Sequence, residues 1–264
     1  MQELKVNEIY NIDCLKGMKY IQDKSIDMII CDLPYGVLRL EWDNVIPIKE
    51  LWSQYNRIIK DNGVIALFGK EPFSSYLRIN NISMYRYDFI WVKQKGSDIG
   101  NCNVKPMNYH EVISIFYKNK PCYNQQYIPR ISNRVKQAQK NNYKGFRNSS
   151  VTFAGKGLNN NSINFQKYSP DFKRLGSVIE CPSVVSNSKE KVSHPTQKPI
   201  ALIEILIKTY SNENDLILDN CLGSGTTACA CLKTRRNYIG FEIEKNFYNI
   251  ALNRIKKEKT KLYE

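Results

Sequence analysis

The chain has 264 residues, 42% of them hydrophobic, and this length suits one sizeable core: we expect a single α/β domain with an elaboration. No apolar run approaches the length that a bilayer requires, and the segment MQELKVNEIY lacks the pattern of an export signal. We therefore expect a soluble, cytoplasmic protein without a membrane partner. The eight cysteines are scattered, several of them in apolar runs such as those at Cys31 and Cys231, and the two histidines, His110 and His194, are far apart. The cysteine pattern argues against a disulfide framework, and the spacing of the histidines argues against a metal site.

The formal net charge of +14 is concentrated in one region of the chain. Between Glu111 and Glu180 the only acidic residue is Asp171, whereas twelve Lys and Arg residues fall there among many aromatic, Asn and Gln residues. Such a mixture suits phosphates, base edges and stacking better than a plain solvated linker does. The composition favours a nucleic-acid partner but does not by itself indicate an enzyme.

In chain order, the first clear element is a buried strand over residues 25–31, which stops at Asp32-Leu33-Pro34-Tyr35-Gly36. Proline and glycine place that pentapeptide in a loop at the carboxyl end of the strand. A helical pattern runs through residues 51–59, a turn is expected at 61–63, and a second buried strand follows at 64–68. This is a strand, helix, strand unit.

Two further strands, at 87–92 and 111–117, are expected to form an antiparallel pair at one edge of the sheet. After the basic region, the pattern predicts a helix over 199–210, a strand over 215–219, a helix over 226–233 and a strand over 238–242. The predicted fold is a mixed, mostly parallel, Rossmann-like α/β sheet with helices on both faces. Its two strand-end loops would frame a crevice, where open α/β sheets bind ligands.

The second of these loops has the features of a nucleoside site. Gly223-Ser224-Gly225 links the strand ending at Asp219 to a helix that begins with Thr226 and Thr227, so backbone amides can face a ligand. Glu242 ends the next strand, a position from which a carboxylate binds ribose hydroxyls. Near the N-terminus, Asp13-Cys14 offers a second acid, although Asp13 would serve equally well as a helix cap.

The first loop is suited to reaction at an aromatic amino group, whose nitrogen lone pair is delocalised into the ring. Asp32 can accept one amino hydrogen and a backbone carbonyl of Leu33-Pro34 the other, which favours a pyramidal, nucleophilic nitrogen. Tyr35 can stack on an extruded base. Taken alone, the pentapeptide is also consistent with an ordinary strand-ending turn.

Three motifs together, Asp32-Leu-Pro-Tyr35, Gly223-Ser-Gly-Thr-Thr227 and His194-Pro-Thr-Gln-Lys-Pro199, resemble the S-adenosylmethionine-dependent DNA amino-methyltransferases. Because the catalytic motif precedes the cofactor motif, the chain is similar to the permuted β group, adenine-N6 type. The resemblance spans nearly the whole chain. It implies a catalytic half of the core over 1–117, a target-recognition insertion over 118–190 and a cofactor-binding half over 191–264.

The resemblance also implies site residues. The base pocket would hold the catalytic residues Asp32, Leu33, Pro34 and Tyr35. The residues expected around S-adenosylmethionine are Asp13, Cys14, Asp32, Thr196, Lys198, Asp219, Gly223, Ser224, Gly225, Thr226, Thr227 and Glu242.

The chain departs from the family pattern at two places. Leu33 replaces a proline, which keeps the backbone carbonyl, and Cys221 stands where the family commonly has an aromatic residue. The second departure implies that one aromatic contact to the cofactor is missing.

The implied activity is methylation of N6 of a flipped adenine in double-stranded DNA. A homodimer and a partner restriction endonuclease are further expectations for the family. We also expect a bacterial or phage origin. Methylation of cytosine N4 is the nearest alternative, although those enzymes more often have Ser in place of Asp32. Cytosine carbon-five chemistry would need Pro121-Cys122 as the nucleophile segment and leaves the Asp32 loop unexplained. Enzymes that methylate protein glutamine or RNA, and an inactive DNA-binding relative, also remain open. The recognition sequence cannot be read from residues 118–190.

Overall fold

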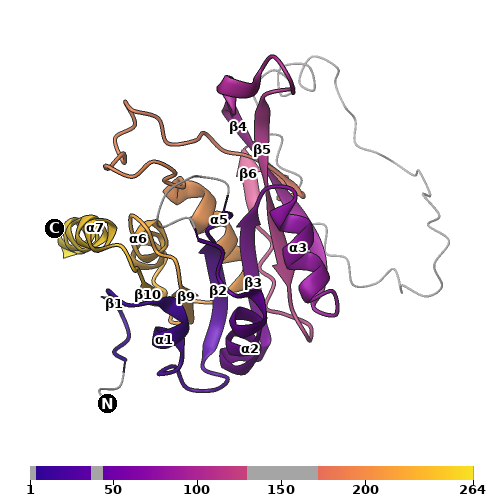
Figure 1. Cartoon of the computed structure of the whole chain (residues 1–264). Coiled ribbons are helices and arrows are strands. Elements are labelled where there is room, and N and C mark those ends of the chain that lie inside the picture. Colours follow the sequence, from indigo (N-terminus) through magenta and orange to yellow (C-terminus); the bar gives the residue numbers. More distant parts are fainter. Residues whose placement is uncertain (1–3, 37–43, 130–171, 264) are drawn as a thin grey trace, which may run out of the picture. The chain divides into compact units, whose positions relative to one another are not determined.

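The computed structural model describes residues 4–36, 44–129 and 172–263. By its internal contacts the chain divides into two units, residues 1–124 with 176–264 and residues 125–175. The first unit contains the sheet and its helices (Figure 1). In its described residues no helix is both long and apolar enough to cross a membrane.

The sheet of the first unit has eight strands in the order β1-β10-β9-β2-β3-β5-β4-β8. Strands β1, β10, β9, β2 and β3 run parallel, β5 is antiparallel to β3 and to β4, and β8 is parallel to β4. Their bounds are Glu8–Tyr10 for β1, Ile26–Asp32 for β2, Ile59–Gly69 for β3, Tyr85–Ser97 for β4, Asn108–Phe116 for β5, Val178–Glu180 for β8, Leu216–Asp219 for β9 and Asn237–Phe241 for β10. The expected mixed, mostly parallel sheet is confirmed.

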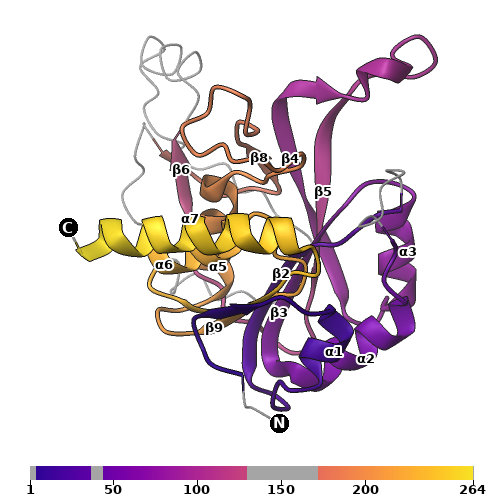
Figure 2. The ribbon, with the colours of Figure 1, turned by 60° about the vertical axis from the view of Figure 1, so that its left-hand side comes forward.

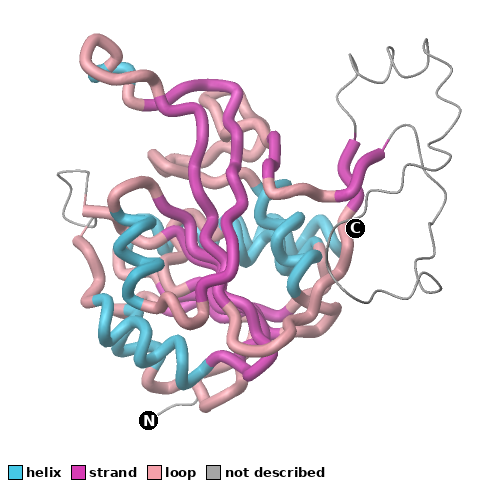
Figure 3. Tube along the Cα trace, turned by 90° about the vertical axis from the view of Figure 1, so that its right-hand side faces the viewer, coloured by secondary structure: helices cyan, strands magenta, loops and turns pink. Residues whose placement is uncertain are grey.

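Helices cover both faces of this sheet (Figures 1 and 3). Contacts link α1 (Cys14–Met18) and α3 (Phe73–Asn80) to α2 (Ile48–Ile58), and α5 (Ile200–Tyr210) and α7 (Lys245–Tyr263) to α6 (Thr226–Lys233). Helix α2 shows why such segments pack against a sheet, since Leu51, Trp52, Tyr55 and Ile58 recur at helical spacing and all are buried. Burial of these apolar side chains provides most of the stability of the helix.

The central position of β2 sets the location of the site. Residues Met28 to Cys31 of β2 are almost completely buried, as a strand covered on both faces requires. Strand β2 pairs with β9 on one side and with β3 on the other. Because β2 and β9 are parallel neighbours, their last residues, Asp32 and Asp219, lie at the same edge of the sheet. Two residues that lie far apart in the sequence therefore meet at one crevice.

Among the elements that were predicted, three details differ from the prediction. The turn expected at 61–63 lies inside β3, which starts at Ile59 by pairing with Ile26 and continues through an irregular register. The pair β4 and β5 is longer than expected and extends beyond its neighbours as a hairpin (Figure 2). It is not the edge of the sheet, because β8 pairs with the outer side of β4. A three-residue strand carries too little periodicity to be predicted locally.

In the second unit, β6 (Tyr127–Pro129) and β7 (Phe172–Arg174) form an antiparallel ribbon. The Leu175 N–H closes this ribbon by donating a hydrogen bond to the Gln126 carbonyl over 2.8 Å. Most of the insertion predicted over 118–190, including the majority of its basic residues, lies in residues 130–171, outside the part of the chain that the structure describes. Its role in target recognition stays a prediction.

Candidate active site

One cavity of about 630 Å³ lies within the first unit, at the carboxyl ends of β2 and β9. Asp32 to Tyr35 line it from the loop after β2, and Asp219 to Ser224 line it from the loop after β9. The His194–Lys198 segment contributes further lining, together with Asp13, Cys14, Thr226, Thr227 and Glu242. The three motifs of the sequence analysis therefore meet around one cavity, as the strand order requires.

At the β2 end, the Asp32 carboxylate is bound through both oxygens. The Tyr35 hydroxyl donates a hydrogen bond to Oδ1 over 2.5 Å, and the Lys198 ammonium binds Oδ2. The Tyr35 ring packs against Phe73 with 5.1 Å between centroids. Leu33 is buried, whereas about a quarter of the Asp32 side chain is exposed, at 24%. The loop thus presents a positioned carboxylate and an aromatic ring to the cavity.

Asp32 is the first of four charged side chains that are linked by ion pairs. Lys198 Nζ lies 3.2 Å from Glu111 Oε2, and Lys93 Nζ lies 3.0 Å from Glu111 Oε1. Burial alone would raise the pKa of Glu111, but the positive charges of Lys198 and Lys93 outweigh it and lower this pKa. Burial disfavours the charged form of Lys198, yet Asp32 and Glu111 hold its pKa above the usual value. All these contacts concern charged groups withdrawn from water, where electrostatic effects are strong.

At the β9 end, Asp219 organises the glycine turn. Its carboxylate accepts a hydrogen bond from the Cys221 N–H over 3.1 Å and another from the Thr227 hydroxyl over 2.6 Å. Burial raises the pKa of Asp219 to about 7, although the hydrogen bond from Thr227 acts in the opposite direction. The next residue, Asn220, accepts a hydrogen bond from the buried Tyr55 hydroxyl over 2.6 Å. The turn is thereby tied to helix α2.

Glu242, directly after β10, is held by the same turn. Gly223 N–H donates to Glu242 Oε2 over 2.7 Å, and Glu244 N–H donates to Oε1 over 2.8 Å. Gly223 has a φ of +54°, and a Cβ there would lie 2.9 Å from His194 Nε2, so glycine is required by both conformation and space. Because each Glu242 oxygen has one backbone donor, each keeps acceptor capacity toward the cavity.

Other predicted residues have partly structural roles. Asp13 caps α1 by accepting a hydrogen bond from the Lys16 N–H over 3.0 Å, and it also lines the cavity, so the two interpretations of this residue are compatible. Gly225 is not among the cavity-lining residues; its φ of +80° starts α6, and a Cβ there would lie 3.1 Å from that of Ala251. Thr196 and Cys14 do line the cavity.

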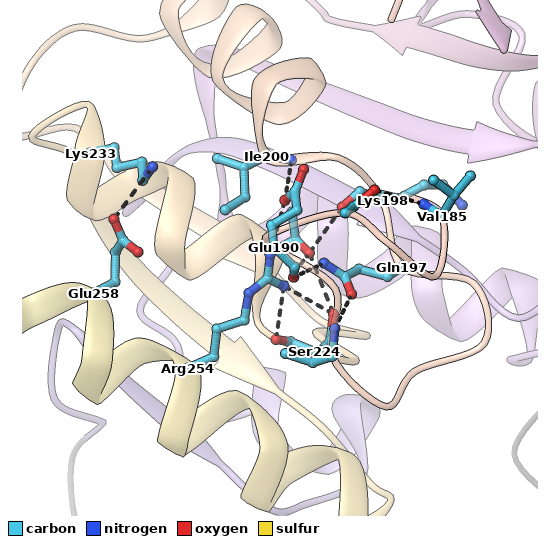
Figure 4. A network of polar contacts seen from close by, with 12 residues as sticks. Val185, Glu190, Gln197, Lys198, Ile200, Ser224, Lys233, Arg254 and Glu258 are labelled. Atoms are coloured by element: carbon cyan, nitrogen blue, oxygen red, sulfur yellow. Dashed lines mark hydrogen bonds and ion pairs between the residues drawn. The ribbon is translucent and has the colours of Figure 1, made fainter. Parts of the chain in front are cut away.

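Figure 4 shows how the segment before α5 is fastened to the glycine turn. Arg254 of α7 donates to Thr226 Oγ1 over 2.9 Å and to Ser224 Oγ over 3.2 Å, and it pairs with Glu190 Oε2 at 3.2 Å. Gln197 Nε2 donates to the Glu190 carbonyl over 2.8 Å. The cavity wall is therefore cross-linked by polar contacts between segments that are distant in the sequence.

The structure thus places the predicted residues Asp13, Cys14, Asp32 to Tyr35, Thr196, Asp219, Gly223, Ser224, Thr226, Thr227 and Glu242 around the cavity, and leaves out Gly225. Lys198 lines it too, and its ammonium contacts Asp32 and Glu111. Sequence reasoning missed Glu111, Lys93 and Arg254. A single charged residue inside an apolar strand or helix forms no recognisable motif. The one available signal is Glu111, an acid that precedes the apolar residues of its strand.

Comparison with known proteins identifies the family. The DNA methylase family of N6 and N4 methyltransferases matches residues 26–253, so the chain belongs to it. Type II methyltransferase M1.MboII of Moraxella bovis is 27% identical over 270 residues, which cover 94% of this chain and 96% of that protein. DNA adenine methyltransferase YhdJ of Escherichia coli K12 is 25% identical over 260 residues, 92% of this chain and 80% of that one.

Solved structures agree with this assignment. The M1.HpyAVI-SAM complex superposes with a TM-score of 0.62 at 25% identity, covering 94% of this chain and 98% of that chain. The cytosine-N4-specific PvuII DNA methyltransferase superposes with a TM-score of 0.65 at 15% identity, covering 96% and 87%, and shows the shared fold. The family match and the complex of the similar chain confirm the expected class and cofactor, an S-adenosylmethionine-dependent DNA methyltransferase.

Proposed function

We propose that this chain transfers the methyl group of S-adenosylmethionine to the N6 amino group of a specific, flipped adenine in duplex DNA. The observation that carries the proposal is the shared cavity: the Asp32-Leu-Pro-Tyr35 loop and the Gly223 turn line one space although they lie far apart in the sequence. Amino-group acceptors and a nucleoside-binding turn are both required for such a transfer, and neither suffices alone.

The residues at the β9 end fit the cofactor. A cavity of about 630 Å³ lies within the range of small-molecule sites. Glu242 would accept hydrogen bonds from the ribose hydroxyls, since its orientation is already set by two backbone donors. Asp219 and the Gly223 to Thr227 turn would lie along the methionine side, with Asp13 and Cys14 at the adenine. Bound there, S-adenosylmethionine supplies an electrophilic methyl group.

The residues of the β2 loop would act on the target base. Asp32 accepts one amino hydrogen, and the Leu33 carbonyl accepts the other. These two hydrogen bonds localise the lone pair on nitrogen, and they strengthen as positive charge develops there. In this proposal Asp32 also takes the proton that the nitrogen must lose. The Tyr35 ring stacks on the extruded base, and stacking of about 1–3 kcal/mol offsets much of the cost of extrusion.

Adenine is favoured over cytosine as the target. The motif begins with Asp32, whereas the N4 enzymes more often begin it with Ser, and one similar protein is named a DNA adenine methyltransferase. The basic region over 118–190 would bind the duplex and read the sequence. A partner restriction endonuclease and a cytoplasmic location, with a bacterial or phage origin, belong to the same proposal and are supported by the Type II names of several relatives. A homodimer is proposed only as an expectation for the family.

The test is incubation with labelled S-adenosylmethionine and mixed-sequence duplex DNA, followed by nucleoside analysis. We expect N6-methyladenine from the native chain and none from Asp32→Ala, while the variant keeps its affinity for S-adenosylmethionine. Asp61→Ala is the matched control, because the Asp61 side chain is 60% exposed in surface ion pairs. N4-methylcytosine as the product would refute the adenine assignment, and undiminished transfer by Asp32→Ala would refute the mechanism.

A further inference from the structure

Four buried or half-buried side chains of alternating charge contact one another in sequence along the wall of the cavity. Asp32 contacts Lys198, Lys198 contacts Glu111, and Glu111 contacts Lys93. The side chains of Lys198 and Glu111 are each only 10% exposed and that of Lys93 is 7% exposed. Charges withdrawn from water in this way are costly unless each is compensated, so the order of the four matters.

The arrangement creates a conflict at Asp32. The proposed reaction needs this carboxylate as an acceptor for the amino group of the base, yet its Oδ1 already accepts from Tyr35 and its Oδ2 from Lys198. A carboxylate oxygen has two lone pairs, so sharing is geometrically possible. However, a bound ammonium competes for the same oxygen and weakens it as an acceptor of a neutral amino group. Asp32 would therefore be a better acceptor for the base if Lys198 loosened its hold as the base arrives.

Glu111 is placed to receive that charge. Its Oε1 is occupied by Lys93, whereas its Oε2 faces Lys198 Nζ at 3.2 Å. Its backbone is fixed by the pairing of β5 with β4, where Glu111 lies opposite Trp91. The Lys198 ammonium also lies 5.2 Å from the centroid of the Phe68 ring and 6.0 Å from that of Trp91, within the range of cation–π attraction. The ammonium stays compensated when its distance from Asp32 increases.

We infer that Glu111 is a positioning residue: it draws the Lys198 ammonium away from Asp32 and so frees the Asp32 carboxylate for the amino group of the target base. This inference rests on the proposed function, because it assigns Asp32 to that amino group. Without the negative charge of Glu111, Lys198 would have Asp32 as its only anionic partner among the described residues within ion-pair distance. It would then hold Asp32 more tightly.

The experiment compares Glu111→Gln and Glu111→Asp with the native chain, on a DNA whose methylated site has been mapped with the native chain. Single-turnover methylation, S-adenosylmethionine affinity and thermal unfolding are measured for each. We expect Glu111→Gln to slow methylation by at least about tenfold while cofactor affinity changes by less than about twofold. Glu111→Asp keeps the charge and should retain much more of the rate. Glu204→Gln is the control, since Glu204 pairs with Lys208 on the surface of one helix.

The second half of the experiment repeats the substitution in a Lys198→Gln background. If Glu111 acts by drawing Lys198, Glu111→Gln should add no further loss of rate once the ammonium is gone. A merely structural role would give the same fractional loss in both backgrounds, together with weaker cofactor binding. Should Glu111→Gln fail to fold, Glu111→Ala, which also removes the negative charge, is compared with and without Lys198→Gln.

Three results would overturn the inference: a native rate for Glu111→Gln, an equal loss for the Gln and Asp variants, or a full loss in the Lys198→Gln background. These leave the proposed function intact, because the native chain still methylates DNA. If the native chain transfers no methyl group to any DNA, the proposed function fails, and the positioning role fails with it.

Discussion

Replacement of Glu242 by Ala gives a quantitative test of the cofactor half of the site. Each oxygen of Glu242 receives one backbone N–H, at 2.7 Å from Gly223 and 2.8 Å from Glu244, and keeps capacity for one ribose hydroxyl. Hydrogen bonds to a charged acceptor contribute about 1.5 kcal/mol or more each. Losing both costs about 3 kcal/mol, so the dissociation constant of S-adenosylmethionine should rise on the order of 100-fold.

The same substitution should also lower the stability of the free protein, because two backbone N–H groups lose their acceptor. Both residues, Gly223 and Glu244, line the cavity, so we expect a loss of about 1–2 kcal/mol, or a few degrees in melting temperature. Calorimetric titration measures the affinity, and thermal unfolding without ligand measures the stability. Glu213→Ala is the control, since the Glu213 side chain is 58% exposed in a surface ion pair. A dissociation constant within about twofold of the native value would remove Glu242 from the ribose site.

Three further predictions concern the turn, its neighbour and the second unit. Gly223→Ala should lower the melting temperature by several degrees in thermal unfolding, because it combines a φ of +54° with a Cβ 2.9 Å from His194 Nε2; an unchanged melting temperature would show that the turn relaxes. Burial, and then the positive charge of Lys198, lowers the pKa of His194 from 6.5 to about 4. As the pH falls from 6.5 toward 4, His194 is therefore protonated in the unfolded chain before it is protonated in the folded one, and the stability that is fully present above pH 6.5 declines. Between pH 7 and pH 5 the free energy of unfolding of the native chain should fall by about 2 kcal/mol more than that of His194→Gln, measured by denaturant unfolding. Parallel pH profiles for the two proteins would contradict this. Replacing Lys173 and Arg174 with Gln should reduce the slope of log affinity for DNA against log salt by about 0.9 for each phosphate that these side chains neutralise, and an equal slope would exclude both from the DNA interface.

Local patterns are sufficient for the elements that carry the two main motifs. Helix α6 spans Thr226–Lys233 as predicted, because a glycine turn starts it and a short apolar strand precedes it. The buried strand that ends at Asp32 is also predicted within one residue, since a continuous apolar run followed by Pro and Gly has few alternatives. In contrast, β8 at the sheet edge and helix α7 are not predicted, because their sequences carry weak periodicity and their positions depend on distant partners.

The sequence by itself determined which reactive groups are present. An acid, a proline and a tyrosine follow one buried strand, and a glycine turn with a later acid follows a second buried strand. These are local properties, set by residue type and by the short-range stereochemistry of turns and strand ends. Only the tertiary structure decided that β2 and β9 are parallel neighbours, which brings Asp32 and Asp219 to one cavity.

The tertiary structure also decided the partners of Lys198, whose ammonium binds a carboxylate 166 residues earlier in the chain. Pairing of that kind depends on the long-range order of the strands and on the position of the segment before α5 at the cavity. Neither leaves a periodic trace in the sequence, and for that reason the contacts of Glu111 with Lys198 and Lys93 could not be predicted from it.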